Sequence, residues 1–227
     1  MHWVEEGKSA YLCLANVHMV MEAHDDPDFR RMINEADLVT PDGAPISWAL
    51  RFLGVRDATQ VRGPELTPRL CRRCARENIP VGFYGGTPEV LDRMTGNLKE
   101  SIPGLQVAYS YSPPFFSLDR RAQDRIIEDI NISGARVLFV GLGCPKQEKW
   151  MAANRNRIHA VMLGVGAAFD ILGKRNKEAP KWMQVAGLEW MYRLANEPRR
   201  LWRRYLYNNP RFLGLLVMQL LTRGGSE

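Results

Sequence analysis

The residues best suited to chemistry follow short apolar runs, at the points where strands would end. Gly141-Leu142-Gly143 comes directly after the apolar run Val137–Val140, and Pro145 and Lys146 follow it. Glycine permits positive φ angles and close backbone approach, proline suits the first turn of a helix, and the N–H groups of that turn attract anions. The pattern predicts half of a pocket for a nucleoside diphosphate, although an ordinary strand-to-helix turn has the same appearance.

Two common nucleotide-binding motifs do not fit this turn. The dinucleotide fingerprint G-x-G-x-x-G needs a glycine where Lys146 stands, and no acidic residue ends the next predicted strand, Ala160–Gly164. A P-loop needs a GK[ST] tripeptide, which the chain lacks. The sequence therefore disfavours an NAD-dependent enzyme and a P-loop protein.

Two further turns carry glycines at predicted strand ends. Gly85-Gly86 follows the run Pro80–Tyr84, and Gly164-Val165-Gly166 precedes Phe169 and Asp170. Asp170 has the oxygens to accept hydrogen bonds from a ribose or a base, or it caps a structural turn. Because the carboxyl ends of parallel strands meet at one edge, we expect these turns to share a cleft.

Two polar side chains follow the first two predicted strands. Asp42 comes after Asp37–Val39, where a carboxylate can serve as a general base toward a hydroxyl or cap the next helix. Asn16 comes after Tyr11–Leu14, where it can bind a sugar or cap a helix, and His18 is interpreted as a half-buried surface residue.

No metal site is predicted. Asp26-Pro27-Asp28 spells D-x-D, but no apolar strand precedes it, so helix capping explains it more simply. Cys71 and Cys74 have no second ligand pair at zinc-site spacing and are interpreted as ordinary core or surface cysteines.

Strand-like runs alternate with helical patterns along the chain. The predicted strands are Tyr11–Leu14, Asp37–Val39, Pro80–Tyr84, Leu105–Tyr109, Val137–Val140 and Ala160–Gly164. Such alternation predicts a Rossmann-like α/β fold, with a mostly parallel sheet of about six strands and helices on both faces. We expect a catalytic domain over 1–180 and a basic, amphipathic, helical appendage over 181–227.

The positive charge is concentrated at the end of the chain. The net charge is +6, and from Trp190 onward seven arginines face two glutamates, interleaved with aromatic residues. Such a segment suits the headgroup layer of a membrane; a helix packed on the core with a solvated basic face and a nucleic-acid-binding patch are the alternatives. The sequence has no signal peptide and no apolar run of about 20 residues, so we expect a cytoplasmic protein.

Several stretches, in their order along the chain, resemble the WecG/TagA/CpsF family of bacterial glycosyltransferases, glycosyltransferase family 26. The matching residues are Asn16, Glu35-Ala36-Asp37-Leu38-Val39, Pro41-Asp42-Gly43, Gly63, Leu66, Gly85-Gly86, Gly141-Leu142-Gly143, Pro145-Lys146-Gln147-Glu148, Gly164-Val165-Gly166, Phe169-Asp170, Ala179-Pro180, Leu188-Glu189-Trp190, Arg193 and Glu197-Pro198. One departure is Leu14, which stands where some members have threonine.

The resemblance implies inverting transfer of a hexose, often N-acetylmannosamine or its uronic acid, from a UDP-sugar to a sugar on undecaprenyl diphosphate. The products would be surface or extracellular polysaccharides, made without a cofactor or required metal by a protein attached peripherally to the inner face of the cytoplasmic membrane. Nucleic acid is not an expected partner, and assembly into a homo-oligomer is left open. The alternative is a non-catalytic UDP-sugar-binding subunit of a polysaccharide synthesis complex.

The resemblance also implies roles for individual residues, with Asp42 as the catalytic base. The substrate-binding residues would be Asn16, Gly43, Arg62, Gly85, Gly86, Gly141, Gly143, Pro145, Lys146, Gln147, Glu148, Gly166, Phe169 and Asp170. The residues for the lipid acceptor or the membrane would be Arg193, Arg199, Arg200, Arg203 and Arg204.

Overall fold

The computed structural model describes residues 1–114, 119–175 and 177–224. Its strands are β1 (Ala10–Ala15), β2 (Leu38–Pro41), β3 (Val81–Gly85), β4 (Val107–Tyr111), β5 (Val137–Gly141) and β6 (Val161–Gly164). Its helices are α1 (His2–Glu5), α2 (Val17–Asp25), α3 (Pro27–Asn34), α4 (Ala44–Phe52), α5 (Gly63–Arg76), α6 (Pro88–Ser101), α7 (Arg120–Ile132), α8 (Lys146–Asn154), α9 (Ala168–Leu172), α10 (Lys181–Val185), α11 (Glu189–Asn196) and α12 (Pro198–Gly224).

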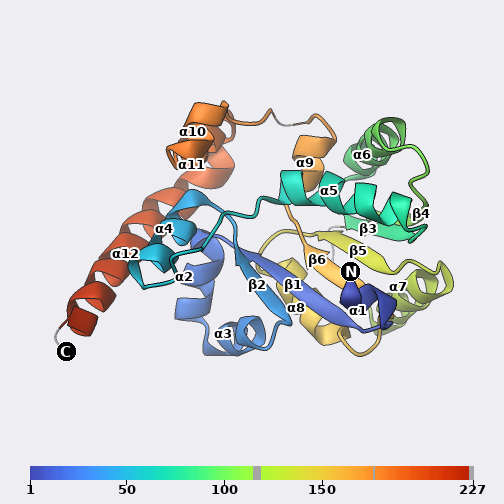
Figure 1. Cartoon of the computed structure of the whole chain (residues 1–227), viewed down its shortest axis with the longest axis horizontal. Helices are drawn as coiled ribbons and strands as arrows, with labels where there is room; N and C mark the ends of the chain where they lie inside the picture. Colours follow the sequence, from blue (N-terminus) through green and yellow to red (C-terminus); the bar gives the residue numbers. More distant parts are fainter. Residues whose placement is uncertain (115–118, 176, 225–227) are drawn as a thin grey trace. The chain divides into compact units, whose positions relative to one another are not determined.

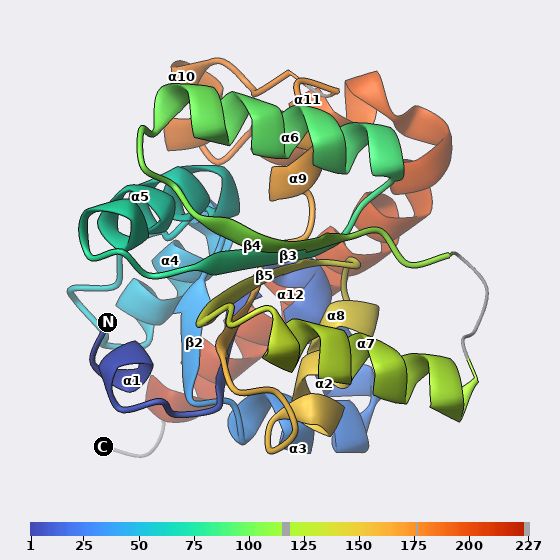
Figure 2. The same cartoon turned by 90° about the vertical axis from the view of Figure 1, so that its right-hand side faces the viewer.

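The strands form one sheet in the order β2-β1-β6-β5-β3-β4 (Figure 1). The pairs β1–β6, β6–β5, β5–β3 and β3–β4 are parallel. Helices α5, α6 and α9 lie on one face of the central strands, and α7 and α8 lie on the other (Figures 1 and 2). The predicted Rossmann-like sheet with helices on both faces is therefore confirmed.

The chain divides into two compact units. Unit 1 comprises residues 1–14, 32–39 and 63–177, and unit 2 comprises residues 15–31, 40–62 and 178–227. The last segment of unit 2 begins close to the predicted boundary at 180, but that unit also includes two earlier segments of the chain. The appendage predicted over 181–227 is thus grouped with residues that the sequence analysis assigned to the catalytic domain.

Apolar residues on the strands form the core of unit 1. All five residues of β3 are buried, and the Phe83 ring stacks on Phe139 of β5 with a centroid distance of 5.2 Å. Phe169 of α9 meets Phe83 edge to face at 6.0 Å. Because Val, Leu and Phe dominate strands that are covered on both faces, these runs read as continuous rather than alternating apolar segments.

The fourth strand begins two residues later than predicted. Leu105 is buried, but its N–H donates to the carbonyl of Ile102, and Gly104 has a φ of +82°. These residues form a turn, so β4 begins at Val107. The prediction for Leu105 was wrong because an apolar residue in a buried turn has the same sequence signal as one in a strand.

The C-terminal segment of unit 2 is helical. Gly187, with a φ of +69°, lies between α10 and α11, and α12 continues through Pro210. Phe212 of α12 packs in a cluster with Met21 of α2 and Ile46 of α4. The predicted helical appendage is present, and one face of α12 belongs to the core of unit 2.

The opposite face of α12 is apolar and open to solvent. Leu206, Leu213, Val217 and Leu221 are each more than half exposed. Of the helices that the structure describes, none combines the length and the apolar character needed to cross a bilayer.

Candidate active site

The glycine turns after β3 and β5 lie against each other in unit 1. Gly85 and Gly141 are partners in the parallel register, and the N–H of Gly86 donates to the carbonyl of Gly141 at 3.1 Å. Gly85 has a φ of +124°, and a Cβ built on it would lie 2.6 Å from the backbone of Gly141. Glycine is therefore required here by backbone conformation and by close approach, and the two turns are adjacent, while the cleft predicted between them stays a prediction.

Gln147 connects two of the turns. The N–H of Gly143 donates to Gln147 Oε1 at 3.2 Å, and Gln147 Nε2 donates to Glu148 Oε1 at 2.7 Å. The same amide lies against Gly164 and Gly166, where an added Cβ would come within 3.0 and 3.4 Å of it. Gln147 and Glu148 are buried, and their side chains hold the backbone of the turns in place.

The other predicted substrate residues of unit 1 surround these turns. Phe169 is 1% exposed, and its ring packs on Gly141 and Gly86. Asp170 lies in the first turn of α9 and forms an ion pair with Arg175 at 3.6 Å. Pro145 is the N-cap of α8, and Lys146, its first residue, is exposed. Their roles in binding a nucleotide remain predictions.

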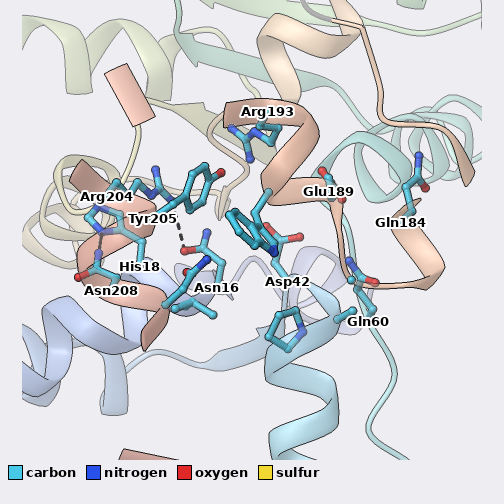
Figure 3. Close-up of a pocket in the computed structure, with 17 residues that line it drawn as sticks. Asn16, His18, Asp42, Gln60, Gln184, Glu189, Arg193, Arg204, Tyr205 and Asn208 are labelled. Carbon is cyan, nitrogen blue, oxygen red and sulfur yellow. Dashed lines mark hydrogen bonds between the residues drawn. The ribbon is translucent and has the colours of Figure 1, made fainter. Parts of the chain in front are cut away.

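Unit 2 contains a cavity that includes the predicted base (Figure 3). Its lining residues are Asn16, Val17, His18, Asp42, Gly43, Ala44, Pro45, Gln60, Gln184, Gly187, Glu189, Trp190, Arg193, Arg204, Tyr205, Asn208 and Asn209. They come from the ends of β1 and β2, the starts of α2 and α4, the loop between α4 and α5, the helices α10, α11 and α12, and the turn between α10 and α11.

Asp42 does not cap the following helix. The N-cap of α4 is Gly43, at a φ of +108°, and no side chain caps this helix. The backbone N–H of Asp42 donates to the carbonyl of Ala15 at 2.7 Å, which fixes the residue at the end of β2. Since its carboxylate forms neither a hydrogen bond nor an ion pair with any described residue, it remains available to a ligand.

The environment of Asp42 raises its pKa to about 7. Burial is the largest cause, because it disfavours the charged form, and the negative charge of Glu189 adds to it. The positive charges of Arg193, Arg62 and Arg204 act in the opposite direction. A carboxylate with a pKa near neutrality suits general-base catalysis, because it is both ionised and basic at the same pH.

Asn16 caps α2, which is one of the two roles left open by the sequence, and its role in binding a sugar stays a prediction. Its Oδ1 accepts the N–H of Met19 at 3.2 Å and so caps α2, and it also accepts a hydrogen bond from Arg204 at 3.4 Å at the cavity wall. His18 Nδ1 lies 3.2 Å from the amide nitrogen of Asn208 and 3.6 Å from Glu22. The cap orients Asn16, and α12 supplies its second partner.

The predicted arginines divide into two groups. Arg193 and Arg204 line the cavity, whereas Arg199, Arg200 and Arg203 are exposed. Arg200 pairs with Glu197 at 2.5 Å, and Arg203 lies over the Trp202 ring. The exposed arginines and Arg62, which is 6% exposed and absent from the lining, keep their assigned roles only as predictions.

Sequence reasoning missed several cavity residues. Glu189 and Trp190 were noted only as matching a motif, and Tyr205 only as part of an aromatic, basic stretch. The Trp190 and Tyr205 rings lie with centroids 5.8 Å apart, which joins α11 to α12 at the cavity. The motif match was the signal available for Trp190, and the aromatic residues within a basic segment were the signal for Tyr205.

No metal site is evident in the part of the chain that the structure describes. Among these residues, no group of three or more His, Cys, Asp or Glu side chains is arranged to hold an ion. Cys71 and Cys74 are free and buried in α5. The expectation that no metal is required remains a prediction.

Comparisons with known proteins agree with the resemblance seen in the sequence. A family model described as "Glycosyl transferase WecG/TagA/CpsF family" matches residues 1–226. The chain is also similar to an N-acetylglucosaminyldiphosphoundecaprenol N-acetyl-beta-D-mannosaminyltransferase from Bacillus spizizenii. The two are 30% identical over 205 residues, an alignment that covers 90% of this chain and 77% of the relative.

Proposed function

The chain belongs to the WecG/TagA/CpsF family of glycosyl transferases, and from this premise we propose that it transfers a hexose from a UDP-sugar to a sugar carried on undecaprenyl diphosphate. The name of the Bacillus relative supports this acceptor class and makes N-acetylmannosamine, or a related hexose, the first donor to test. The product would enter the biosynthesis of a surface or extracellular polysaccharide.

The observation that carries the proposal is the Asp42 carboxylate in the cavity of unit 2, which has no partner among the described residues and has a pKa raised to about 7. Inverting transfer needs an acceptor hydroxyl that loses its proton as its oxygen attacks the anomeric carbon. Asp42 would accept that proton while the bond from the anomeric carbon to UDP breaks. General-base assistance of this kind contributes roughly 10²–10⁴-fold to the rate.

The leaving diphosphate needs partners for its growing negative charge. The cationic side chains of Arg193 and Arg204, which line the cavity of unit 2 with Asp42, are the proposed partners for this charge. We expect no metal requirement, so transfer in the presence of EDTA should equal transfer in its absence.

Because the proposed acceptor is a lipid, the protein must contact a membrane. Exposed apolar residues on α12, including Leu213 and Val217, together with exposed Arg199 and Arg203, support peripheral binding to an anionic bilayer. We propose that this contact is with the cytoplasmic face of the cell membrane. Basic residues near such a surface gain about 1 kcal/mol each.

The test is a transfer assay with the full chain, a panel of UDP-hexoses and a short-chain N-acetylglucosaminyl diphospholipid. The expected result is one transferred hexose with an inverted anomeric centre. Asp42→Asn should reduce kcat by roughly 10²–10⁴-fold while calorimetry shows unchanged binding of UDP. Absence of transfer from every donor would refute the proposed function, and near-normal turnover by Asp42→Asn would remove Asp42 from the role of base.

A further inference from the structure

Several charged and titratable groups face the Asp42 carboxylate in unit 2. They are Glu189 and Arg193 of α11, Arg62 before α5, Arg204 and Tyr205 of α12, and His18 of α2. Three arginines contribute to its electrostatic environment, yet none of them forms an ion pair with Asp42. At least one of these guanidinium groups must therefore pair with a residue other than Asp42.

Glu189 supplies that other partner for Arg62. Glu189 Oε2 lies 3.3 Å from Arg62 Nε, and Arg62 Nη1 donates to Gln184 Oε1 at 2.8 Å. The Arg62 side chain is 6% exposed, whereas Glu189 is 24% exposed and lines the cavity with Asp42 (Figure 3). Because a buried guanidinium has fixed donor directions, pairing with α10 and α11 limits its pairing with Asp42.

If Asp42 is the base, as proposed above, Glu189 gains a function beyond packing. We propose that Glu189 is a positioning residue for the transfer reaction: it engages Arg62 and sets a second negative charge at the cavity, so that Asp42 stays unpaired and able to accept a proton. Glu189 raises the pKa of Asp42 directly, and it also occupies Arg62, whose charge lowers that pKa. Both effects keep Asp42 a stronger base.

The first test observes Asp42 without requiring activity. The carboxyl ¹³C signals of aspartate-labelled full chain are followed by NMR between pH 4 and 9, and Asp42→Asn identifies the Asp42 signal. Glu189→Gln should lower the titration midpoint of Asp42 by about one pH unit or more, because a neighbouring like charge is lost. Arg62→Gln should shift the midpoint in the opposite direction, which provides an independent test if Glu189→Gln does not fold.

The chain offers a matched control for Glu189. Glu178 also lies near Arg62, with an Oε1 to Nη2 distance of 4.0 Å, but it is 42% exposed and does not line the cavity. Glu178→Gln removes the same charge from the same arginine and should leave the Asp42 midpoint within a few tenths of a pH unit. Glu189→Asp retains the charge and should return the midpoint toward the wild-type value.

The second test measures the pH dependence of kcat/KM for transfer to the diphospholipid. In Glu189→Gln the acidic limb should move to lower pH together with the NMR midpoint, because it reports the essential base of the free enzyme. The rate above pH 8 should fall by less than the roughly 10²-fold loss expected when the base is removed entirely. Since histidines titrate in the same range, agreement with the NMR midpoint assigns the limb to Asp42 rather than to His18.

Each outcome decides the role of Glu189. An Asp42 midpoint that is unchanged or raised in Glu189→Gln overturns the proposal, as does an acidic limb that stays in place while the NMR midpoint moves. A Glu178→Gln shift as large as that of Glu189→Gln also overturns it. If the wild-type chain transfers no hexose, the proposed function fails, whereas the NMR midpoints still show whether Glu189 controls the charge of Asp42.

Discussion

Replacing Asp42 with Asn should make the protein more stable at neutral pH while it abolishes most activity. The carboxylate has a folded-state pKa of about 7, against an ordinary value of 3.8, and burial is the main cause. Asn has nearly the same shape as a protonated Asp but carries no charge to bury. The difference in the free energy of unfolding between the variant and the wild type therefore measures how much an ionised group in this cavity destabilises the protein.

The sign and size of the effect follow from proton binding. Because the folded-state pKa is raised, the folded chain binds more protons than the unfolded chain between about pH 4 and pH 7, so stability falls as the pH rises through this window. The difference between 3.8 and about 7 corresponds to at most roughly 4 kcal/mol. The free energy of unfolding of Asp42→Asn should equal that of the wild type near pH 4. It should exceed the wild-type value by a margin that grows up to pH 7 and stays constant above pH 7.

Thermal and urea unfolding of the two proteins at pH 4, 5, 6, 7 and 8 measures this difference. For a chain of this length, 1 kcal/mol corresponds to about 2–4 °C in Tm. Asp57→Asn is the control, since Asp57 is exposed and its carboxylate stays hydrated in both states. An Asp42→Asn advantage that does not vary with pH, or a variant less stable than wild type at pH 8, would refute the reasoning.

Three further predictions concern the turns, the arginines and the last helix. Gly85→Ala should destabilise the protein by at least about 1–3 kcal/mol in urea unfolding and weaken UDP binding in calorimetry, because its Cβ would meet the backbone of Gly141 at a φ of +124°. Arg204→Met should raise KM for the diphospholipid acceptor in the transfer assay, whereas Arg199→Met, at an exposed position outside the cavity lining, should not. Replacing Leu213 and Val217 together with Gln should reduce co-sedimentation with anionic vesicles and leave the melting temperature nearly unchanged, because both side chains are more than half exposed.

These predictions also have controls or contrary outcomes. Gly96 lies on the exposed side of α6 with no atom within 4 Å of an added Cβ, so Gly96→Ala should stabilise the protein by about 0.5–1 kcal/mol. Equal KM values for Arg204→Met and wild type would exclude Arg204 from acceptor binding. Vesicle binding that is unchanged by the double replacement on α12 would contradict the prediction and would show that another surface binds the membrane.

Local patterns were sufficient for the sheet and its glycine turns. Continuous apolar runs such as Val137–Val140 need burial on both faces, and glycines after Tyr84 and Val140 permit backbone conformations that other residues rarely adopt. These requirements operate over a few residues, so the sequence predicts them directly. The start of β4 was the exception, because Leu105 satisfies the same need for burial in a turn.

The charge state of the candidate base depended on the tertiary structure. The sequence by itself determined that Asp42 follows a strand, but from the local pattern alone a helix cap was favoured over a general base. The structure excludes the cap, because Gly43 is the N-cap of α4 and the Asp42 carboxylate has no partner among the described residues, while the role of base stays a prediction. Glu189 and Arg62, more than 120 residues apart in the chain, meet near Asp42 only after folding. Electrostatic interactions depend on distance in space and on burial, and neither quantity can be read from sequence separation.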